Sequence, residues 1–391
     1  MSRIRAGLCL LLALPGVPCA QDPAKKRDKE EAWRVDPHGC QDPETQKRLG
    51  YVSLGPFPFG DDHGTAEIEQ TLGGVKLLWT ETAHFRFGSG LPAYTLGLDK
   101  DEKQKLGDEV KRLKLKLGKL KFDGKQLDPW LRHHLFAQRI EDCYEDFCKR
   151  LGVDEAATPR LGQKGKFAVL LLEKASAFGR YQVRYLKVTN DGPQRHNFID
   201  SGVMFYGSAT EHGQGAMRND TALHCQTVFN LIHNFVAAYK GYYYTTPLWW
   251  EEGLAHWFER RIDPKRNSFS YLADVEGAAT KEWDWKPKIR ARVGFDHFVP
   301  FARMLEWQKY EELNFADHMM VWSRVDYVMS LGDDKFAAIM NELKGRQDSR
   351  GIPPTPEQLV TIQLAALQKV LGCDPKGFDQ AWKQWVLAKY K

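Results

Sequence analysis

The chain has 391 residues, of which 42% are hydrophobic and 12% aromatic, so it can bury a large core and is not a disordered chain. Its length suits one large domain or two modest ones. A net charge of +5 is modest for this length and does not favour a nucleic-acid-binding protein.

The first twenty residues have the pattern of a secretory signal peptide. Arg3 and Arg5 precede an apolar run over residues 6–14, and Ala20 is a small residue before a cleavage point. Pro18 is a poor residue three positions before that point, so the pattern leaves the exact site open. We expect a secreted, periplasmic or envelope-associated protein. No later stretch has eighteen uninterrupted apolar residues, which predicts no transmembrane segment in the mature chain.

Residues 21–70 are charged at first and then rich in proline and glycine, which predicts a flexible arm that wraps around the rest of the chain rather than folding alone. Residues 71–215 are expected to form an α/β subdomain. Strands are predicted at 75–80, 83–87, 167–172 and 204–206, and a helix is predicted over 129–151.

The most basic stretch, residues 101–125, alternates lysines with leucines. A patch that binds nucleic acid or an anionic surface is one interpretation. We favour a solvated face or a connector, because aromatic side chains are not interleaved with the lysines and the chain has a secretory signal. No nucleic-acid partner is expected.

Five of the seven cysteines lie beyond the signal region, at positions 40, 143, 148, 225 and 373. An odd number leaves at least one thiol unpaired. Cys143 and Cys148 are five positions apart on an expected helix, a poor spacing for a mutual disulfide. We therefore expect that disulfides do not organise this fold.

Residues 216–391 are expected to form a helical subdomain. The helical spacing of apolar residues predicts its later helices, with glycine and proline between them. These predicted helices cover residues 316–331, 335–344, 356–371 and 375–390.

Two segments of this helical part carry a pattern associated with zinc chemistry. Leu231-Ile-His-Asn-Phe-Val-Ala237 is followed after a short gap by Pro247-Leu-Trp-Trp-Glu-Glu-Gly-Leu-Ala-His-Trp-Phe-Glu259. The second segment resembles the W-x-x-E-G-L-A helix of the gluzincin (peptidase MA-like) zinc metallopeptidases, and the first lies where their H-E-x-x-H motif is found. The resemblance implies an α+β fold, in which a small mixed sheet with helices is followed by a mainly helical C-terminal subdomain. It also implies a cleft between the two parts, with the family's edge strand near residues 204–206.

Two residues of the H-E-x-x-H motif are replaced in this chain. In that motif two histidines four positions apart share a helical face and bind Zn²⁺, while the glutamate accepts a proton from the metal-bound water. Here only His233 remains. Asn234 replaces the glutamate and cannot accept that proton, and Ala237 replaces the second histidine and has no ligand atom.

The resemblance places the family's third ligand at Glu252. His256 follows four positions later on the same helical face, so His233, Glu252 and His256 form an alternative three-ligand set. We expect His233, Asn234, Ala237, Glu251 and Glu252 to line the cleft, although Glu251 also fits a solvated carboxylate at the start of a helix.

Three functions remain compatible with these residues. The favoured one is a secreted, catalytically inactive pseudo-peptidase that binds a peptide or protein and needs no cofactor. The second is a divergent zinc-dependent hydrolase that uses His233, Glu252 and His256. The third is a structural envelope-associated protein that binds no ligand in the cleft.

Overall fold

The computed structural model describes residues 32–241, 246–270, 283–343 and 354–391. The chain divides into two compact units, residues 1–36 and 37–391. The described end of the first unit is a 3₁₀ helix, Ala32–Arg34, in which the Arg34 guanidinium lies 4.6 Å from the centre of the Trp33 ring. The predicted signal peptide lies outside the described residues.

The second unit contains a five-stranded mixed sheet with the strand order β1-β2-β5-β7-β6. The two inner pairs, β2 with β5 and β5 with β7, are parallel, and the two outer pairs are antiparallel. The strands are β1 (Leu78–Glu81), β2 (Phe85–Gly90), β5 (Phe167–Leu172), β6 (Gln194–Phe198) and β7 (Val203–Ala209). A separate two-stranded sheet pairs β3 (Tyr94–Thr95) with β4 (Gln126–Leu127).

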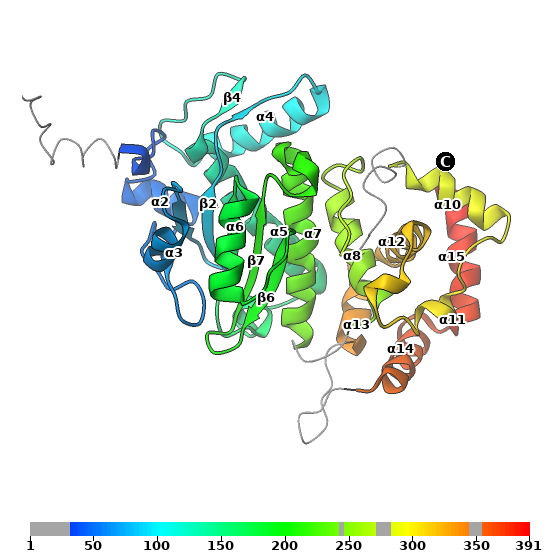
Figure 1. Cartoon of the computed structure of the whole chain (residues 1–391). Coiled ribbons are helices and arrows are strands. Elements are labelled where there is room, and N and C mark those ends of the chain that lie inside the picture. The colour runs from blue at the N-terminus through cyan, green and yellow to red at the C-terminus, as the bar shows by residue number, and fades with distance from the viewer. Residues whose placement is uncertain (1–31, 242–245, 271–282, 344–353) are drawn as a thin grey trace, which may run out of the picture. The chain divides into compact units, whose positions relative to one another are not determined.

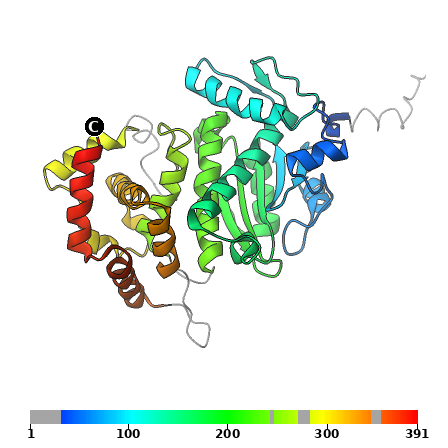
Figure 2. The ribbon, with the colours of Figure 1, turned by 180° about the vertical axis from the view of Figure 1, so that it is seen from behind.

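The central strand β5 is buried on both faces, which explains its uninterrupted apolar sequence. Phe167, Val169 and Leu171 point into the core shared with α5 (Pro129–Leu151) and α7 (Asp220–Lys240). The alternate residues of β5 point into a second core with α3 (Thr65–Leu72) and α6 (Ala175–Tyr181). Helices therefore cover both faces of the sheet, as the two opposite views show (Figures 1 and 2).

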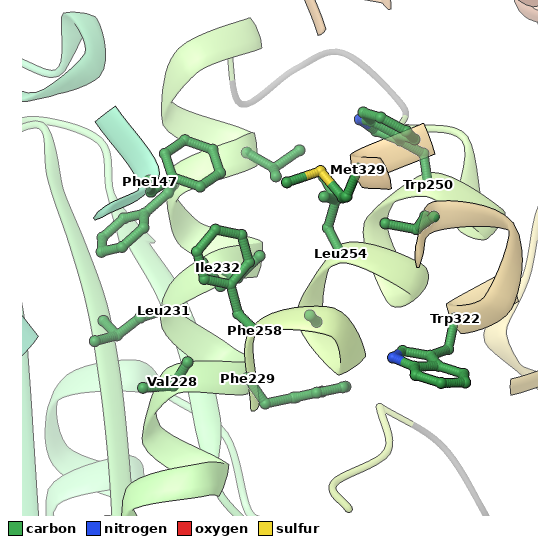
Figure 3. Close-up of a cluster of buried hydrophobic side chains, with 14 of the residues drawn as sticks. Phe147, Val228, Phe229, Leu231, Ile232, Trp250, Leu254, Phe258, Trp322 and Met329 are labelled. Carbon is green, nitrogen blue, oxygen red and sulfur yellow. The ribbon is translucent and has the colours of Figure 1, made fainter. Parts of the chain in front are cut away.

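The C-terminal half is mainly helical and packs around α8 (Leu248–Arg260), which lies between α7 and α12 (Phe315–Ser330). Apolar side chains from these three helices meet in one cluster that includes Ile232, Leu254 and Met329 (Figure 3). The remaining helices of this half are α10 (Trp285–Gly294), α11 (Phe301–Met304), α13 (Asp333–Leu343), α14 (Pro356–Leu371) and α15 (Pro375–Lys389). The expected α+β fold class, a small mixed sheet followed by a helical part, is confirmed.

The bounds of the predicted elements agree with the structure to within three residues. The expected edge strand of the sheet does not agree. The predicted strand at 204–206 is part of β7, which is paired on both sides inside the sheet. The neighbouring strand β6 forms that edge, and the sequence did not predict it, because its first four residues are polar and only partly buried.

The basic stretch forms a helix for much of its length. In α4 (Lys100–Lys114), Leu106, Val110 and Leu113 are buried against Leu131 and Leu135 of α5. The intervening lysines at positions 103, 111 and 114 are exposed. Leu106 and Leu113 of this stretch therefore serve packing, and the lysines at 103, 111 and 114 form a solvated face, whereas Leu115 is exposed.

The predicted N-terminal arm contributes helices and core residues. It contains α2 (Pro43–Leu49) and the whole of α3 except its last two residues. Phe57, Phe59 and Ile68 are buried in the core beneath the sheet. Among the described residues, no helix combines the length and the apolar character needed to cross a membrane.

Candidate functional site

The helix that carries His233 is anchored at its N-terminus. Asn219 caps α7 by accepting a hydrogen bond from the backbone N–H of Ala222. Asp220, the first residue of α7, is fully buried and pairs with Arg132 and Arg139 of α5 at 2.9 and 2.6 Å. These contacts fix the position of α7, and hence of His233, against the rest of the core.

The two replaced motif positions contact the sheet and the core. The Asn234 side chain is buried and donates a hydrogen bond of 3.2 Å from Nδ2 to the backbone carbonyl of Phe205 in β7. Ala237 is half-buried and packs against the main core. Asn234 therefore ties α7 to the sheet, a role that suits an amide donor and does not require a base.

The predicted residues Glu252 and His256 lie together on α8, and a histidine from α12 joins them. His256 Nε2 lies 3.0 Å from His318 Nδ1 and 3.7 Å from Glu252 Oε2, and the His318–Glu252 distance is 3.4 Å. All three side chains are buried. We refer to Glu252, His256 and His318 as the His/Glu cluster.

His318 was missed by the sequence analysis. It lies 62 positions beyond His256, in a helix that carries no motif of its own. A histidine on an apolar helix was the only available signal, and such a residue is ordinarily part of the core. Its proximity to Glu252 arises from the packing of α12 on α8.

A second acidic side chain, Glu259, contacts the ring nitrogen of His256 that faces away from the cluster. Glu259 Oε1 lies 2.7 Å from His256 Nδ1, so the other ring nitrogen of His256 is directed at His318 and Glu252. The backbone N–H of Ser268 donates to both Glu259 oxygens, at 3.1 and 2.9 Å. Burial raises the pKa of Glu259 well above its usual range, and the Ser268 N–H opposes this shift.

The protonation states within the site follow from burial and from neighbouring groups. Burial lowers the pKa of His233, and it lowers that of His256 well below its usual value, so both imidazoles are neutral at pH 7. Burial alone would raise the pKa of Glu252. The adjacent His318 and His233 outweigh burial and hold this pKa below its ordinary value, so Glu252 is a carboxylate.

His233 lies beside the cluster and contacts the other Glu252 oxygen. Its Nδ1 lies 2.7 Å from Glu251 Oε1, and its Nε2 lies 3.5 Å from Glu252 Oε1. Ser270 Oγ is also 3.5 Å from His233 Nε2, which is too long for a strong hydrogen bond. Glu251 is nearly buried, and Arg195 Nη1 lies 3.9 Å from its Oε1. His233 therefore has a short contact to the Glu251 carboxylate and only a long one to the Ser270 hydroxyl.

A cleft of about 1010 Å³ adjoins this site. Three basic residues, Arg195, Lys265 and Arg266, and one acidic residue, Asp191, line it. The complete lining consists of residues 190–195, 213–217 and 265–270, with Ala222, Gln226 and Asn230 of α7.

Phe269 and Ser270 separate the cleft from the buried cluster. Both line the cleft. The Phe269 ring centre lies 5.4 Å from that of His256 and 5.0 Å from that of His318. The His/Glu cluster thus lies directly beneath one wall of the cleft.

Neither a scan against protein-family models nor a search of curated proteins finds a match to this chain. The gluzincin resemblance therefore depends on the motif residues quoted above.

Proposed function

We propose that this chain is a secreted gluzincin-like protein that binds an extended peptide, or a peptide segment of a protein, in the cleft beside β6 and does not hydrolyse it by the gluzincin mechanism. The observation that supports this most directly is that β6 is one of the two edge strands of the sheet and that its first residues, Gln194 and Arg195, line the cleft. An edge strand has unpaired backbone groups to which an extended peptide can add as a further strand.

The charge of the cleft supports a narrower choice of ligand. Three basic side chains and one acidic side chain line it, so peptides that carry aspartate or glutamate fit its electrostatics better than basic peptides do. We therefore propose an acidic peptide as the ligand class.

The lack of hydrolysis is supported by the contacts of Asn234. The gluzincin mechanism requires a carboxylate at that position to accept the proton of the attacking water. The Asn234 amide instead donates to the Phe205 carbonyl, and an amide has no comparable basicity.

We expect the mature chain to bind dye-labelled random nonapeptides that are enriched in aspartate and glutamate, with fluorescence anisotropy as the measurement. Asn230→Trp places a large side chain in the cleft and should weaken binding by roughly tenfold or more. The matched control is Gln368→Trp on the exposed surface of α14, which should leave binding unchanged.

Three results would contradict the proposal. The first is equal binding of a lysine- and arginine-enriched set of the same length, and the second is no binding of either set. The third is a change in peptide masses after incubation with the wild-type protein and Zn²⁺, since cleavage would show an active hydrolase.

A further inference from the structure

We infer that Glu252, His256 and His318 form a buried binding site for a divalent transition metal, with Zn²⁺ as the best fit. This ligand set is neither the H-E-x-x-H motif nor the His233, Glu252 and His256 set suggested by the sequence. The inference does not depend on peptide binding in the cleft.

The spacing of the three ligand atoms matches a tetrahedral site. With metal–ligand bonds of about 2.0–2.1 Å, two ligands of a tetrahedral Zn²⁺ lie about 3.3–3.4 Å apart. The three distances in the cluster are 3.0, 3.4 and 3.7 Å, which lie on both sides of that value. A metal ion therefore fits between these atoms with side-chain adjustments of a few tenths of an ångström.

The chemistry of the ligands also favours Zn²⁺. Two imidazole nitrogens and one carboxylate oxygen suit zinc, whereas calcium and magnesium prefer ligand sets composed of oxygen. Metal-bound histidines ordinarily hold their other ring nitrogen against a carboxylate or carbonyl. Glu259 does this for His256, at 2.7 Å.

Glu252 supplies an independent observation. Its side chain is fully buried, and within the described part of the chain neither of its oxygens has a hydrogen bond of good geometry, because the ring nitrogens of His318 and His233 lie 3.4 and 3.5 Å away. Buried carboxylates are otherwise compensated by hydrogen bonds or by a cation. A metal ion bound to Glu252 Oε2 compensates the buried negative charge, and Oε2 is the oxygen that both His256 and His318 approach.

His318 and His233 contact different oxygens of the Glu252 carboxylate. His233 Nε2 approaches Oε1, whereas His256 and His318 both approach Oε2. His233 also holds its Nδ1 against Glu251. We therefore assign His233 to the surroundings of the metal site rather than to its ligands.

The test is the zinc content of the tag-free mature chain, purified without chelators and measured by elemental analysis, together with its zinc affinity in competition with a chromogenic chelator. We expect one tightly bound zinc per chain. His318→Ala and Glu252→Gln should each weaken zinc binding by roughly 100-fold or more, because a ligand is lost. His233→Ala is the matched control and should retain zinc.

Three further measurements keep the test informative if a ligand variant does not fold. Glu259→Gln retains all three ligands and should weaken zinc binding by roughly 10-fold to 100-fold. X-ray absorption of the zinc-loaded wild type should show a first shell of nitrogen and oxygen with scattering from two imidazoles. Co²⁺ substitution should give the visible absorption of a tetrahedral centre.

Several outcomes would overturn the inference. They are the lack of stoichiometric zinc in the wild type after incubation with the metal, and zinc that is lost in His233→Ala but kept in His318→Ala. Sulfur in the first shell would also overturn it, because the cluster contains no thiol.

Discussion

At the scale of single residues, buried charges determine how the helices of the site are held. Asp220 is fully buried, and its carboxylate lies between the guanidinium groups of Arg132 and Arg139. Burial by itself would raise the pKa of Asp220, but the two arginines outweigh burial and lower it from 3.8 to about 2. The ion pairs of Asp220 with Arg132 and Arg139 therefore link the start of α7 to α5 at neutral pH.

We expect Asp220→Asn to lower the free energy of unfolding by about 3–5 kcal/mol, because it leaves the buried Arg132 guanidinium without its anion and removes one of the two carboxylates paired with Arg139. The measurement is the midpoint of urea unfolding at pH 7. Asp108→Asn is the control, because Asp108 pairs with Lys111 at an exposed site and its replacement should change stability by about 0.5 kcal/mol or less.

The same carboxylate predicts a pH dependence. Since its pKa is lower in the folded state than in the unfolded state, the stabilisation is fully present above about pH 4 and is lost as the pH falls toward about 2. The shift corresponds to roughly 2 kcal/mol. The stability difference between wild type and Asp220→Asn should therefore shrink across this range. A stability difference that stays constant down to pH 2 would contradict the lowered pKa of Asp220.

At the scale of elements, the approach of α12 to α8 creates the cluster. Gly253 follows Glu252 on α8, and a Cβ atom at this position would lie 2.5 Å from Val325 Cγ2 and 2.7 Å from the Val321 carbonyl oxygen. Only glycine allows the two helices to come this close. His318, one turn before Val321 on α12, reaches Glu252 and His256 as a result.

We expect Gly253→Ala to cost about 1–3 kcal/mol of stability, because the added methyl group overpacks the helix contact. It should also weaken zinc binding if it moves His318 away from Glu252. Gly107→Ala is the matched control, since Gly107 is in a helix with no atom near its added Cβ, and alanine there should be neutral or stabilising by about 0.5–1 kcal/mol. Equal stability of the two variants would argue against close packing at Gly253.

At the scale of the whole molecule, the large core supports the fold, and four of the cysteines in the described residues take no part in disulfides. Cys143, Cys148, Cys225 and Cys373 are free thiols, which confirms the expectation that at least one thiol is unpaired. Burial raises the pKa of each, that of Cys148 to about 12, so these thiols are poorly ionised at neutral pH. Cys373 is only partly buried and is the most accessible of the four.

We expect that, of these four cysteines, a thiol reagent labels Cys373 first in the native protein and that all four react in denaturant. Mass spectrometry of peptides from the labelled protein gives the order. A reducing agent should leave the unfolding temperature unchanged. A clear drop in the unfolding temperature on reduction would mean that a disulfide stabilises the protein, which would contradict the free thiols in the structure.

The sequence predicted much of the fold and only part of the site. Uninterrupted apolar residues predict β5 because both of its faces are buried, and helical spacing predicts α5 and α14 with the bounds that are observed. The spacing of four positions between Glu252 and His256 places both on one face of α8. These features are local, so they can be read from neighbouring residues.

The remaining features depend on contacts between segments that are distant in the chain. The identity of β6 as the edge strand depends on which strands pair, and its polar residues give no periodic signal. The proximity of His318 to Glu252 depends on the close contact at Gly253. The sequence by itself determined α5, the later C-terminal helices and the buried strand β5, because local spacing encodes them, and the gluzincin resemblance indicated Glu252, with His256 four positions later on the same face. Only the tertiary structure decided the third residue and the cleft, because long-range packing brings these parts together.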